Sequence, residues 1–444
     1  MAKILILSSE VIGTTMAGPA IRCWELAKAL SKHHDVILSI PSTSNSPNAS
    51  NTQEISPDTF TVVPRTLTSL KSLLPASDVL ITQLLPRQLA WQAKRHGVRI
   101  LIDAYDPMPL ENLELFQTFP AWLQTYKNTR IVNNMRFAFD MADGILCANS
   151  RQRDLWMGIL MALGKITPEI YHADKTLKNL IDIVPFGLPS APPLKSGDGL
   201  RKMFNLNEND KVLLWGGGIW NWFDPLSLIK AIKQLAEENF PVKLVFMGVK
   251  HPNPAAPEMQ MASDAIQLAK ELDLLDKHVF FNYEWTPYEQ RQNFLLEADI
   301  GVSTHFEHLE TQYAFRTRTL DYIWAGLPIL STKGDSFAEL IQARQLGRVV
   351  PYEDVQAIAQ GIRFLLEPKV KERMQENLHK IRPEYYWESI IQPIENTLTT
   401  FASQPKPFLS IKTIWKILAA CCAAYSPKAI LSESGYRYYK RNQQ

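Results

Sequence analysis

A short acidic and basic segment of the chain gathers side chains that suit phosphate and sugar hydroxyls. Glu310, Arg316, Arg318 and Asp321 lie within twelve residues of one another, directly before the small and apolar run WAGLPIL. An arginine guanidinium is planar, keeps its charge and donates paired hydrogen bonds to a phosphate. A carboxylate such as that of Asp321 can accept hydrogen bonds from two vicinal ribose hydroxyls. This combination predicts a site for a nucleoside diphosphate, and a salt-bridge cluster is the structural alternative.

The place of the two arginines favours the ligand. Arg316 and Arg318 precede the helical pattern LDYIWAG at residues 320–326. Cations are unfavourable beside the positive N-terminal end of a helix dipole, unless an anion joins them. We therefore expect an anion between the arginines and the helix.

A glycine-rich loop, WGGGIWNW at residues 215–222, lies between an expected strand and a helix that starts near Asp224 and Pro225. Proline in the first helical turn after an acidic cap is a helix-start signal. Glycines such as Gly217 and Gly218 let backbone N–H groups approach an anion closely, beside the helix N-terminus. Lys250, after the next expected strand, could add positive charge. A tight turn without a ligand is the alternative for this loop.

The first half of the chain has a counterpart, GTTMAGPAIR at residues 13–22, which contains Gly18 and Arg22. Neither loop contains the GxGxxG pattern, and the P-loop pattern of nucleoside triphosphatases is absent from the chain. The second strand of each half also ends without the acid that would hold an adenosine ribose. These absences disfavour a dinucleotide-dependent dehydrogenase.

A second group of acids follows an expected strand in LIDAYDPMPLE, residues 101–111. Asp103, Asp106 and Glu111 could hydrogen-bond the hydroxyls of an acceptor or assist proton transfer. For Asp106, which directly precedes Pro107, helix capping is the alternative.

These residues need a scaffold, and apolar runs separated by helical patterns provide one. The runs lie at residues 3–9, 35–42, 60–64, 78–84, 98–105, 143–150 and 181–187, and again at 211–218, 242–248, 278–284, 299–304, 327–332 and 347–352. Most are apolar throughout, which is typical of parallel strands that are covered on both faces. The alternation with helices predicts an α/β fold with two doubly wound, Rossmann-like domains that face a cleft.

The composition of the chain supports this division. The 444 residues are too many for one ordinary domain, and the Pro-, Gly- and Ser-rich stretch at 187–199 is typical of a linker. We expect an acceptor-binding domain at 1–188, a nucleotide-sugar-binding domain at 189–385, a terminal helix returning to the first domain at 386–404 and a basic amphipathic tail at 405–444. Residues 41–58 are polar and predict a loop.

Charge, cysteine content and hydropathy exclude several classes of protein. The net charge of +2 is too small to indicate a nucleic-acid partner. Four cysteines without a CxxC pair suit a reducing cytosol and argue against a structural metal site. No apolar run approaches the length of a membrane span, so we expect a cytoplasmic protein.

The motifs together resemble the GT-B glycosyltransferases of the large retaining group 1 family, which includes many bacterial family 4-like enzymes. The resemblance extends to about residue 400. GPAIRCWELAKALSKHHDVIL resembles the opening glycine loop and first helix of the family, and LDYIWAGLPIL resembles its donor-site helix. The stretches WGGGIWNWFDP, FMGVKHPNP and TKGD resemble those of a bacterial subgroup.

The resemblance implies transfer of a sugar from a nucleoside-diphosphate sugar to an acceptor hydroxyl, with retention and without a bound metal or other cofactor. The acceptor would be a glycan or a lipid-linked glycan, as in polysaccharide biosynthesis. In the donor-site helix of the family, an acid binds the ribose and a basic residue three positions earlier contacts phosphate. These positions are Asp321 and Arg318 in this chain, and Glu310, Arg316 and Asp103 are the catalytic candidates.

The chain departs from the family pattern at two places. The paired glutamates of the family have the spacing E-x7-E, which puts Tyr313 rather than Glu310 at the first position. The Arg and Lys that usually follow the first strand of the second domain are replaced by GGIWNW. The diphosphate charge would then be met by Arg316, Arg318, Lys250 and the amides of the glycine loop.

Two other functions fit the same scaffold. One is a nucleotide-sugar epimerase or a phosphorylase, which would act on the donor without this acceptor. The other is a catalytically silent, carbohydrate-binding GT-B protein.

The tail at 405–444 carries seven basic residues and one acid. Its apolar residues fall on one helical face: Ile411, Ile414, Trp415, Leu418, Cys422 and Tyr425. This pattern predicts an interfacial helix at an anionic membrane surface, on the inner face of the membrane. Packing of the same face against the domains is the alternative.

Overall fold

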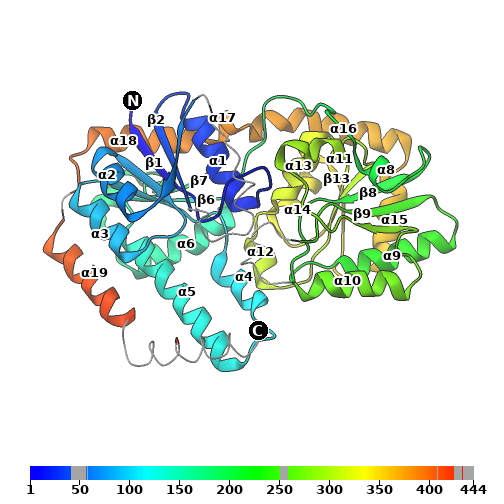
Figure 1. The fold of residues 1–444 in the computed structure, drawn as a ribbon, viewed down its shortest axis with the longest axis horizontal. Helices are drawn as coiled ribbons and strands as arrows, with labels where there is room; N and C mark the ends of the chain where they lie inside the picture. The colour runs from blue at the N-terminus through cyan, green and yellow to red at the C-terminus, as the bar shows by residue number, and fades with distance from the viewer. Residues whose placement is uncertain (42–56, 58, 251–258, 408, 425–432, 434–444) are drawn as a thin grey trace.

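The computed structural model describes residues 1–41, 57, 59–250, 259–407, 409–424 and 433. It contains two parallel sheets with their helices, in two domains that lie side by side (Figure 1). This confirms the predicted pair of Rossmann-like domains. Most of the predicted loop at 41–58 lies outside the described residues, as does the tail after residue 424 except for Glu433.

The first domain is built on a seven-stranded sheet with the order β3-β2-β1-β4-β5-β6-β7. Its strands are β1 (Lys3–Leu7), β2 (Asp35–Pro41), β3 (Thr61–Arg65), β4 (Val79–Thr82), β5 (Arg99–Asp103), β6 (Gly144–Cys147) and β7 (Ile181–Ile183). Its helices are α1 (Gly18–Leu30), α2 (Leu67–Ala76), α3 (Arg87–Arg95), α4 (Met108–Leu115), α5 (Ala121–Met141), α6 (Ser150–Ala162) and α7 (Pro168–Ala173). The strand order reverses between β1 and β4, where the carboxyl ends of the strands leave a crevice.

The second domain has a six-stranded sheet with the order β10-β9-β8-β11-β12-β13. Its strands are β8 (Lys211–Trp215), β9 (Val242–Phe246), β10 (Val279–Phe281), β11 (Ile300–Ser303), β12 (Ile329–Thr332) and β13 (Gly347–Val350). Its helices are α8 (Leu200–Met203), α9 (Pro225–Glu237), α10 (Gln260–Glu271), η2 (Tyr288–Gln290), α11 (Arg291–Leu295), α12 (Leu309–Tyr313), α13 (Thr317–Ala325), α14 (Ser336–Arg344), α15 (Val355–Leu365) and α16 (Pro368–Ile381). The reversal falls between β8 and β11, the strands that precede the glycine loop and the arginine segment.

Local signals set the helices that border the site. The side chain of Asp224 caps α9 by accepting a hydrogen bond from the N–H of Ser227 at 2.9 Å, as predicted from the Asp-Pro pair. Helix α13 ends at Gly326, whose φ of +71° is left-handed and suits glycine. The turn after Gly326 lets β12 return beside β11, so that α13 begins at the carboxyl edge of the sheet.

The end of the chain returns to the first domain, through η3 (Arg382–Tyr385), α17 (Trp387–Ile390), α18 (Gln392–Ser403) and α19 (Ile411–Ala424) (Figure 1). The ring of Trp387 packs against that of Phe186, with their centroids 5.2 Å apart. The chain passes between the domains twice, once in the linker and once in the return segment. These two segments are bound to each other, because Leu188 of the linker exchanges backbone hydrogen bonds with Tyr385 and Trp387 of the return segment.

No helix among the described residues has the length and hydropathy that a membrane crossing requires.

A buried ion pair fastens the carboxyl edge of the first sheet. Arg22 in α1 donates two hydrogen bonds to the carboxylate of Asp103, at the end of β5, both at 2.8 Å. It donates two more to the backbone carbonyls of Val184 and Pro185, which follow β7. Arg22 is 0% exposed and Asp103 is 4% exposed. The side chain of Arg22 therefore joins α1 to the carboxyl ends of β5 and β7.

Asp103→Ala should lower the free energy of unfolding by about 3–5 kcal/mol, because it leaves the guanidinium of Arg22 buried without its anion. The double variant Arg22→Met/Asp103→Leu should cost less than the single one, since it leaves no buried charge. Urea denaturation followed by circular dichroism measures both. Lys32→Ala, which breaks a half-exposed pair with Glu388, is the control and should cost at most about 1 kcal/mol. A normal stability for Asp103→Ala would contradict this role.

Candidate active site

A cavity of about 460 Å³ lies between the two domains. The first domain contributes the start of α1, with Gly18, and the segment between β5 and α4, with Asp106. The second domain contributes the glycine loop after β8 and the start of α13. The cavity therefore lies where the strand order of both sheets reverses.

The glycine loop presents its backbone to this cavity. Gly217 has a φ of +77°, and a Cβ built on it would meet no atom within 4 Å, so its open side faces free space. The neighbouring N–H of Gly216 is held by the hydroxyl oxygen of Tyr322 at 2.8 Å. That hydroxyl also lies 3.0 Å from the carbonyl of Leu214 and 2.8 Å from that of Val302. Tyr322 in α13 thus fixes the loop to the ends of β8 and β11.

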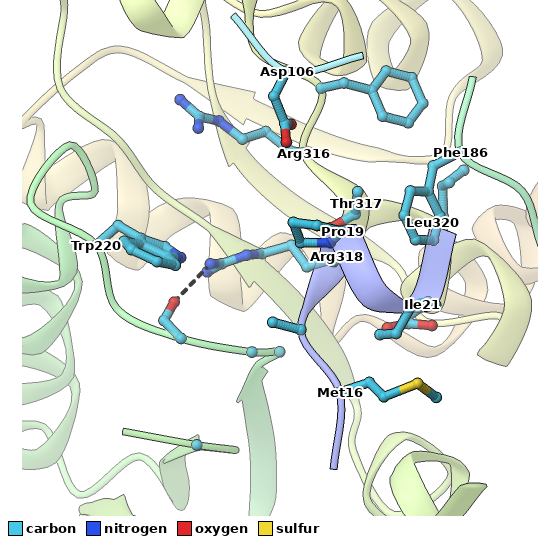
Figure 2. A pocket seen from close by; sticks show the side chains of 18 of the residues that line it. Met16, Pro19, Ile21, Asp106, Phe186, Trp220, Arg316, Thr317, Arg318 and Leu320 are labelled. Atoms are coloured by element: carbon cyan, nitrogen blue, oxygen red, sulfur yellow. Dashed lines mark hydrogen bonds between the residues drawn. The ribbon is translucent and has the colours of Figure 1, made fainter. Parts of the chain in front are cut away.

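Arg318 is the most unusual charged group of the site. Its side chain reaches from the first turn of α13 toward Trp220 and donates a hydrogen bond to the carbonyl of Gly218 at 2.8 Å (Figure 2). The guanidinium packs on the rings of Trp215 and Phe223, 4.6 Å and 4.1 Å from their centroids.

Arg318 is only 8% exposed, and its Nη1 has no hydrogen-bond partner. No carboxylate of the described residues pairs with it, and burial together with the charge of Arg316 lowers its pKa to about 10. A buried cation without an anion is costly, so an anionic ligand at this position would stabilise it.

Arg316, two positions earlier, is paired. Its guanidinium donates hydrogen bonds to both carboxylate oxygens of Glu310, at 2.8 Å and 2.7 Å. Glu310 is 1% exposed and lies behind the arginine rather than in the cavity wall, while Arg316 itself lines the cavity. Pairing with Glu310 raises the pKa of Arg316 against the effect of burial. Glu310 therefore positions the arginine.

Asp321 lines the cavity one turn after Arg318. The Nε of Arg291 donates a hydrogen bond to one carboxylate oxygen of Asp321 at 3.0 Å, and the side chain of Asp321 is 29% exposed. Arg291 is itself fixed between the rings of Tyr288 and Trp324, at 3.7 Å and 4.6 Å from their centroids. The carboxylate is thus oriented and still accessible from the cavity.

Three acids of the first domain line the cavity: Glu10, Asp106 and Glu111. Burial, together with the negative charge of Asp103, raises the pKa of Asp106 to about 7. Burial and the charges of Asp106 and Glu310 raise the pKa of Glu111 well above its ordinary value. A carboxyl with a pKa near 7 is suited to exchange a proton at neutral pH.

The structure brings together most of the residues predicted from the sequence. Those that line the cavity are Gly18, Asp106, Glu111, Gly217, Gly218, Arg316, Arg318 and Asp321. Four others do not line it: Arg22, Asp103, Lys250 and Glu310. For Asp103 and Glu310 the expected catalytic contact needs correction, because each is buried in an ion pair with an arginine. Arg22 is likewise enclosed, and Lys250 is exposed outside the cavity wall.

The residues that hold the two walls together could not be predicted from the sequence. Trp285 donates from its indole Nε1 to the carbonyl of Met16 at 3.1 Å, and the N–H of Tyr288 donates to the carbonyl of Thr14 at 3.0 Å. The same is true of Arg291, because its partner Asp321 lies 30 positions away. No spacing rule links such residues along the chain.

The comparisons with known proteins agree with this architecture. Residues 198–381 match the family model described as glycosyl transferases group 1. No curated protein matches the chain by sequence.

Several solved structures share the fold over nearly the full length. Anabaena HepE in complex with UDP-glucose has a TM-score of 0.59 and 14% identity, over 91% of this chain and 100% of that one. Sucrose-phosphate synthase from Thermosynechococcus elongatus has a TM-score of 0.60 and 16% identity, over 91% and 100%. A glycosyltransferase from Rickettsia africae has a TM-score of 0.59 and 13% identity, over 91% and 99%. The chain therefore has the GT-B fold of these glycosyltransferases, and its residues 198–381 match the model of the group 1 glycosyl transferases.

Proposed function

We propose that this protein transfers a sugar from a nucleoside-diphosphate sugar to the hydroxyl of a glycan or lipid-linked glycan, with retention at the anomeric carbon. The observation that carries the proposal is Arg318, a buried guanidinium in the cavity wall without a carboxylate partner among the described residues. A diphosphate is an anion of the right kind to complete it.

The donor would lie along the second domain. Its diphosphate would lie at the N-terminus of α13 and receive hydrogen bonds from Arg318, from Arg316 and from the N–H groups of Gly217 and Gly218. Its ribose hydroxyls would donate to the carboxylate of Asp321. The complexes of HepE with UDP-glucose and with UDP agree with a donor of this class.

The same groups would assist the reaction. As the bond between the sugar and the diphosphate breaks, negative charge grows on the departing phosphate oxygen. The guanidinium groups of Arg316 and Arg318 are already fixed by Glu310 and Gly218, so they stabilise that charge with little reorganisation. This arrangement supports catalysis by fixed cations in the manner that the family resemblance implies.

The acceptor would approach from the first domain. Its hydroxyl must lose a proton as it attacks the anomeric carbon, and Asp106 is the carboxyl in the opposite wall whose pKa is raised to about 7. In a retaining reaction the acceptor attacks from the face on which the diphosphate leaves, and the departing phosphate is a second base for this proton. Asp106 would orient the acceptor hydroxyl, and its carboxylate and the departing phosphate would be the two acceptors for the proton.

Arg318→Met should weaken the binding of the preferred nucleoside diphosphate by about 1.5–3 kcal/mol, the range for hydrogen bonds to charged groups. It should also leave the melting temperature of the free protein unchanged or higher, because it removes an unpaired buried charge. Calorimetric titration with UDP, GDP, ADP and TDP identifies the base and measures the loss.

Arg316→Met is the matched control. It leaves the carboxylate of Glu310 buried without its partner, so it should lower the melting temperature where Arg318→Met does not. If Arg318→Met destabilises the protein and leaves nucleotide affinity unchanged, the arginine is structural and the proposal fails. Turnover of the sugar nucleotide to another sugar nucleotide without acceptor would indicate an epimerase instead.

Asp321→Ala should reduce the preference for a ribonucleotide over a 2′-deoxyribonucleotide. In the wild type this preference should be about tenfold or more, because the 2′-hydroxyl donates to a charged oxygen. In the variant the two affinities should become nearly equal. Titration of both proteins with the two diphosphates gives the ratio of the affinities. An unchanged ratio in the variant would show that Asp321 does not bind the 2′-hydroxyl.

The raised pKa of Asp106 predicts two dependences on pH. Below pH 7 the carboxyl is protonated and cannot accept a proton, so the transfer rate should fall as the pH decreases through 7. Stability changes in the opposite sense. The folded state holds the proton more tightly than the unfolded state, so ionisation of Asp106 costs stability as the pH rises from about 4 to 7.

Asp106→Asn should therefore gain melting temperature over the wild type between these pH values and keep the gain above pH 7. Thermal scans of both proteins across the range provide the measurement. A difference in melting temperature that does not vary with pH would show that Asp106 titrates normally.

A further inference from the structure

Helix α19 is attached to the first domain by only one of its faces. Ile417 is 4% exposed and belongs to the core of that domain. The carbonyl of Ala420 accepts a hydrogen bond from Nε of Arg87 at 2.9 Å, and Lys416 pairs with Asp140 of α5. The chain just before the helix is held as well, because Arg99 donates to the carbonyl of Pro405 at 2.7 Å. The orientation of α19 about its own axis is therefore fixed.

The opposite face of α19 is apolar and open to solvent. Ile411 is 75% exposed, Trp415 is 67% exposed and Leu418 is 48% exposed. Cys422 is exposed as well, and the four positions follow the spacing of a single helical stripe. These four residues do not pack on the domains, although α19 itself is attached to the first domain through Ile417. Ile414 is half-buried, and Tyr425 lies outside the described residues.

Basic residues accompany this apolar stripe. Lys412 beside Ile411 is exposed, and so is Arg95 at the end of α3, the helix that α19 packs against. The sequence after residue 424 adds four basic residues and one acid. A second copy of the chain would bring the same positive charge to the stripe and be repelled. An anionic lipid surface offers both an apolar layer and the opposite charge.

We propose that the stripe of Ile411, Trp415, Leu418 and Cys422 inserts at the surface of a membrane that contains anionic lipids. The first domain then lies against the lipid, because α19 is fastened to it through Arg87 and Asp140. The aromatic ring of Trp415 and the aliphatic chains enter the boundary between headgroups and acyl chains, and the basic residues contact lipid phosphates. This attachment does not depend on the reaction that the cleft carries out.

The test is co-sedimentation of the full-length protein with vesicles of phosphatidylcholine, with and without phosphatidylglycerol, at low and high salt. The wild type should pellet with the anionic vesicles at low salt and be released by high salt. Trp415→Glu/Leu418→Glu should weaken this partitioning by about tenfold or more, because both side chains would have to enter the apolar layer. Both positions are exposed, so the melting temperature should not change.

Leu194→Glu is the matched control, since Leu194 is 72% exposed in the linker and should not contact lipid. Equal pelleting of the double variant and the wild type would overturn the proposal, as would wild type that stays in solution at low salt. Equal binding to neutral vesicles would overturn the requirement for anionic lipid. A lipid-free dimer that the double variant abolishes, without vesicle binding by the wild type, would assign the stripe to a second copy.

Discussion

The structure depends on how it accommodates buried arginines at the carboxyl edges of its two sheets. Three of them have a carboxylate: Arg22 has Asp103, Arg291 has Asp321 and Arg316 has Glu310. Arg318 donates a hydrogen bond to a backbone carbonyl and packs on two aromatic rings, and no carboxylate of the described residues pairs with it. A charge that is buried without an anion costs several kcal/mol unless something else supplies the anion. Among the four arginines named here, the one without an anion lies in the wall of the cavity between the domains.

The paired arginines explain why the unpaired one is held so firmly. Arg316 and its partner Glu310 fix the segment that leads into α13, while Tyr322 on the same helix ties the glycine loop to β8 and β11. The loop then presents its backbone toward the space that Arg318 faces. Across the cavity, Arg22 and Asp103 fix the end of β5, from which Asp106 enters the opposite wall. Each wall is thus stabilised by a buried salt bridge: Arg22 and Asp103 lie outside the cavity lining, while Arg316 lines the cavity and its partner Glu310 lies behind it.

The sequence was sufficient to predict the fold, because each parallel strand is an apolar run that can be recognised locally. The run at 98–105 contains β5 and the run at 299–304 contains β11, and the Asp-Pro pair correctly marks the start of α9. Residues adjacent to these elements, such as Gly217, Arg318 and Asp321, could also be placed in the site, since the ends of parallel strands meet at one edge.

Pairing between distant residues could not be predicted in this way. Asp103 and Arg22 are 81 positions apart, so the sequence did not reveal that each one neutralises the other and withdraws it from the cavity. Glu310 is a different case: it lies only six positions from Arg316, and the salt-bridge alternative already considered for this segment applies to this pair. The outward stripe of α19 is a further case, because periodicity identifies an apolar face but not the side on which a helix is attached. These outcomes depend on tertiary contacts, which local patterns do not encode.

The central claim is that a diphosphate completes the environment of Arg318. The most direct measurement is a crystal structure of the protein with the nucleoside diphosphate that it binds most tightly. We expect a phosphate oxygen within about 3 Å of the free Nη1 of Arg318, with the ribose hydroxyls at the carboxylate of Asp321. A nucleotide bound elsewhere, or a side-chain carboxylate that reaches Arg318 in the presence of the nucleotide, would contradict it.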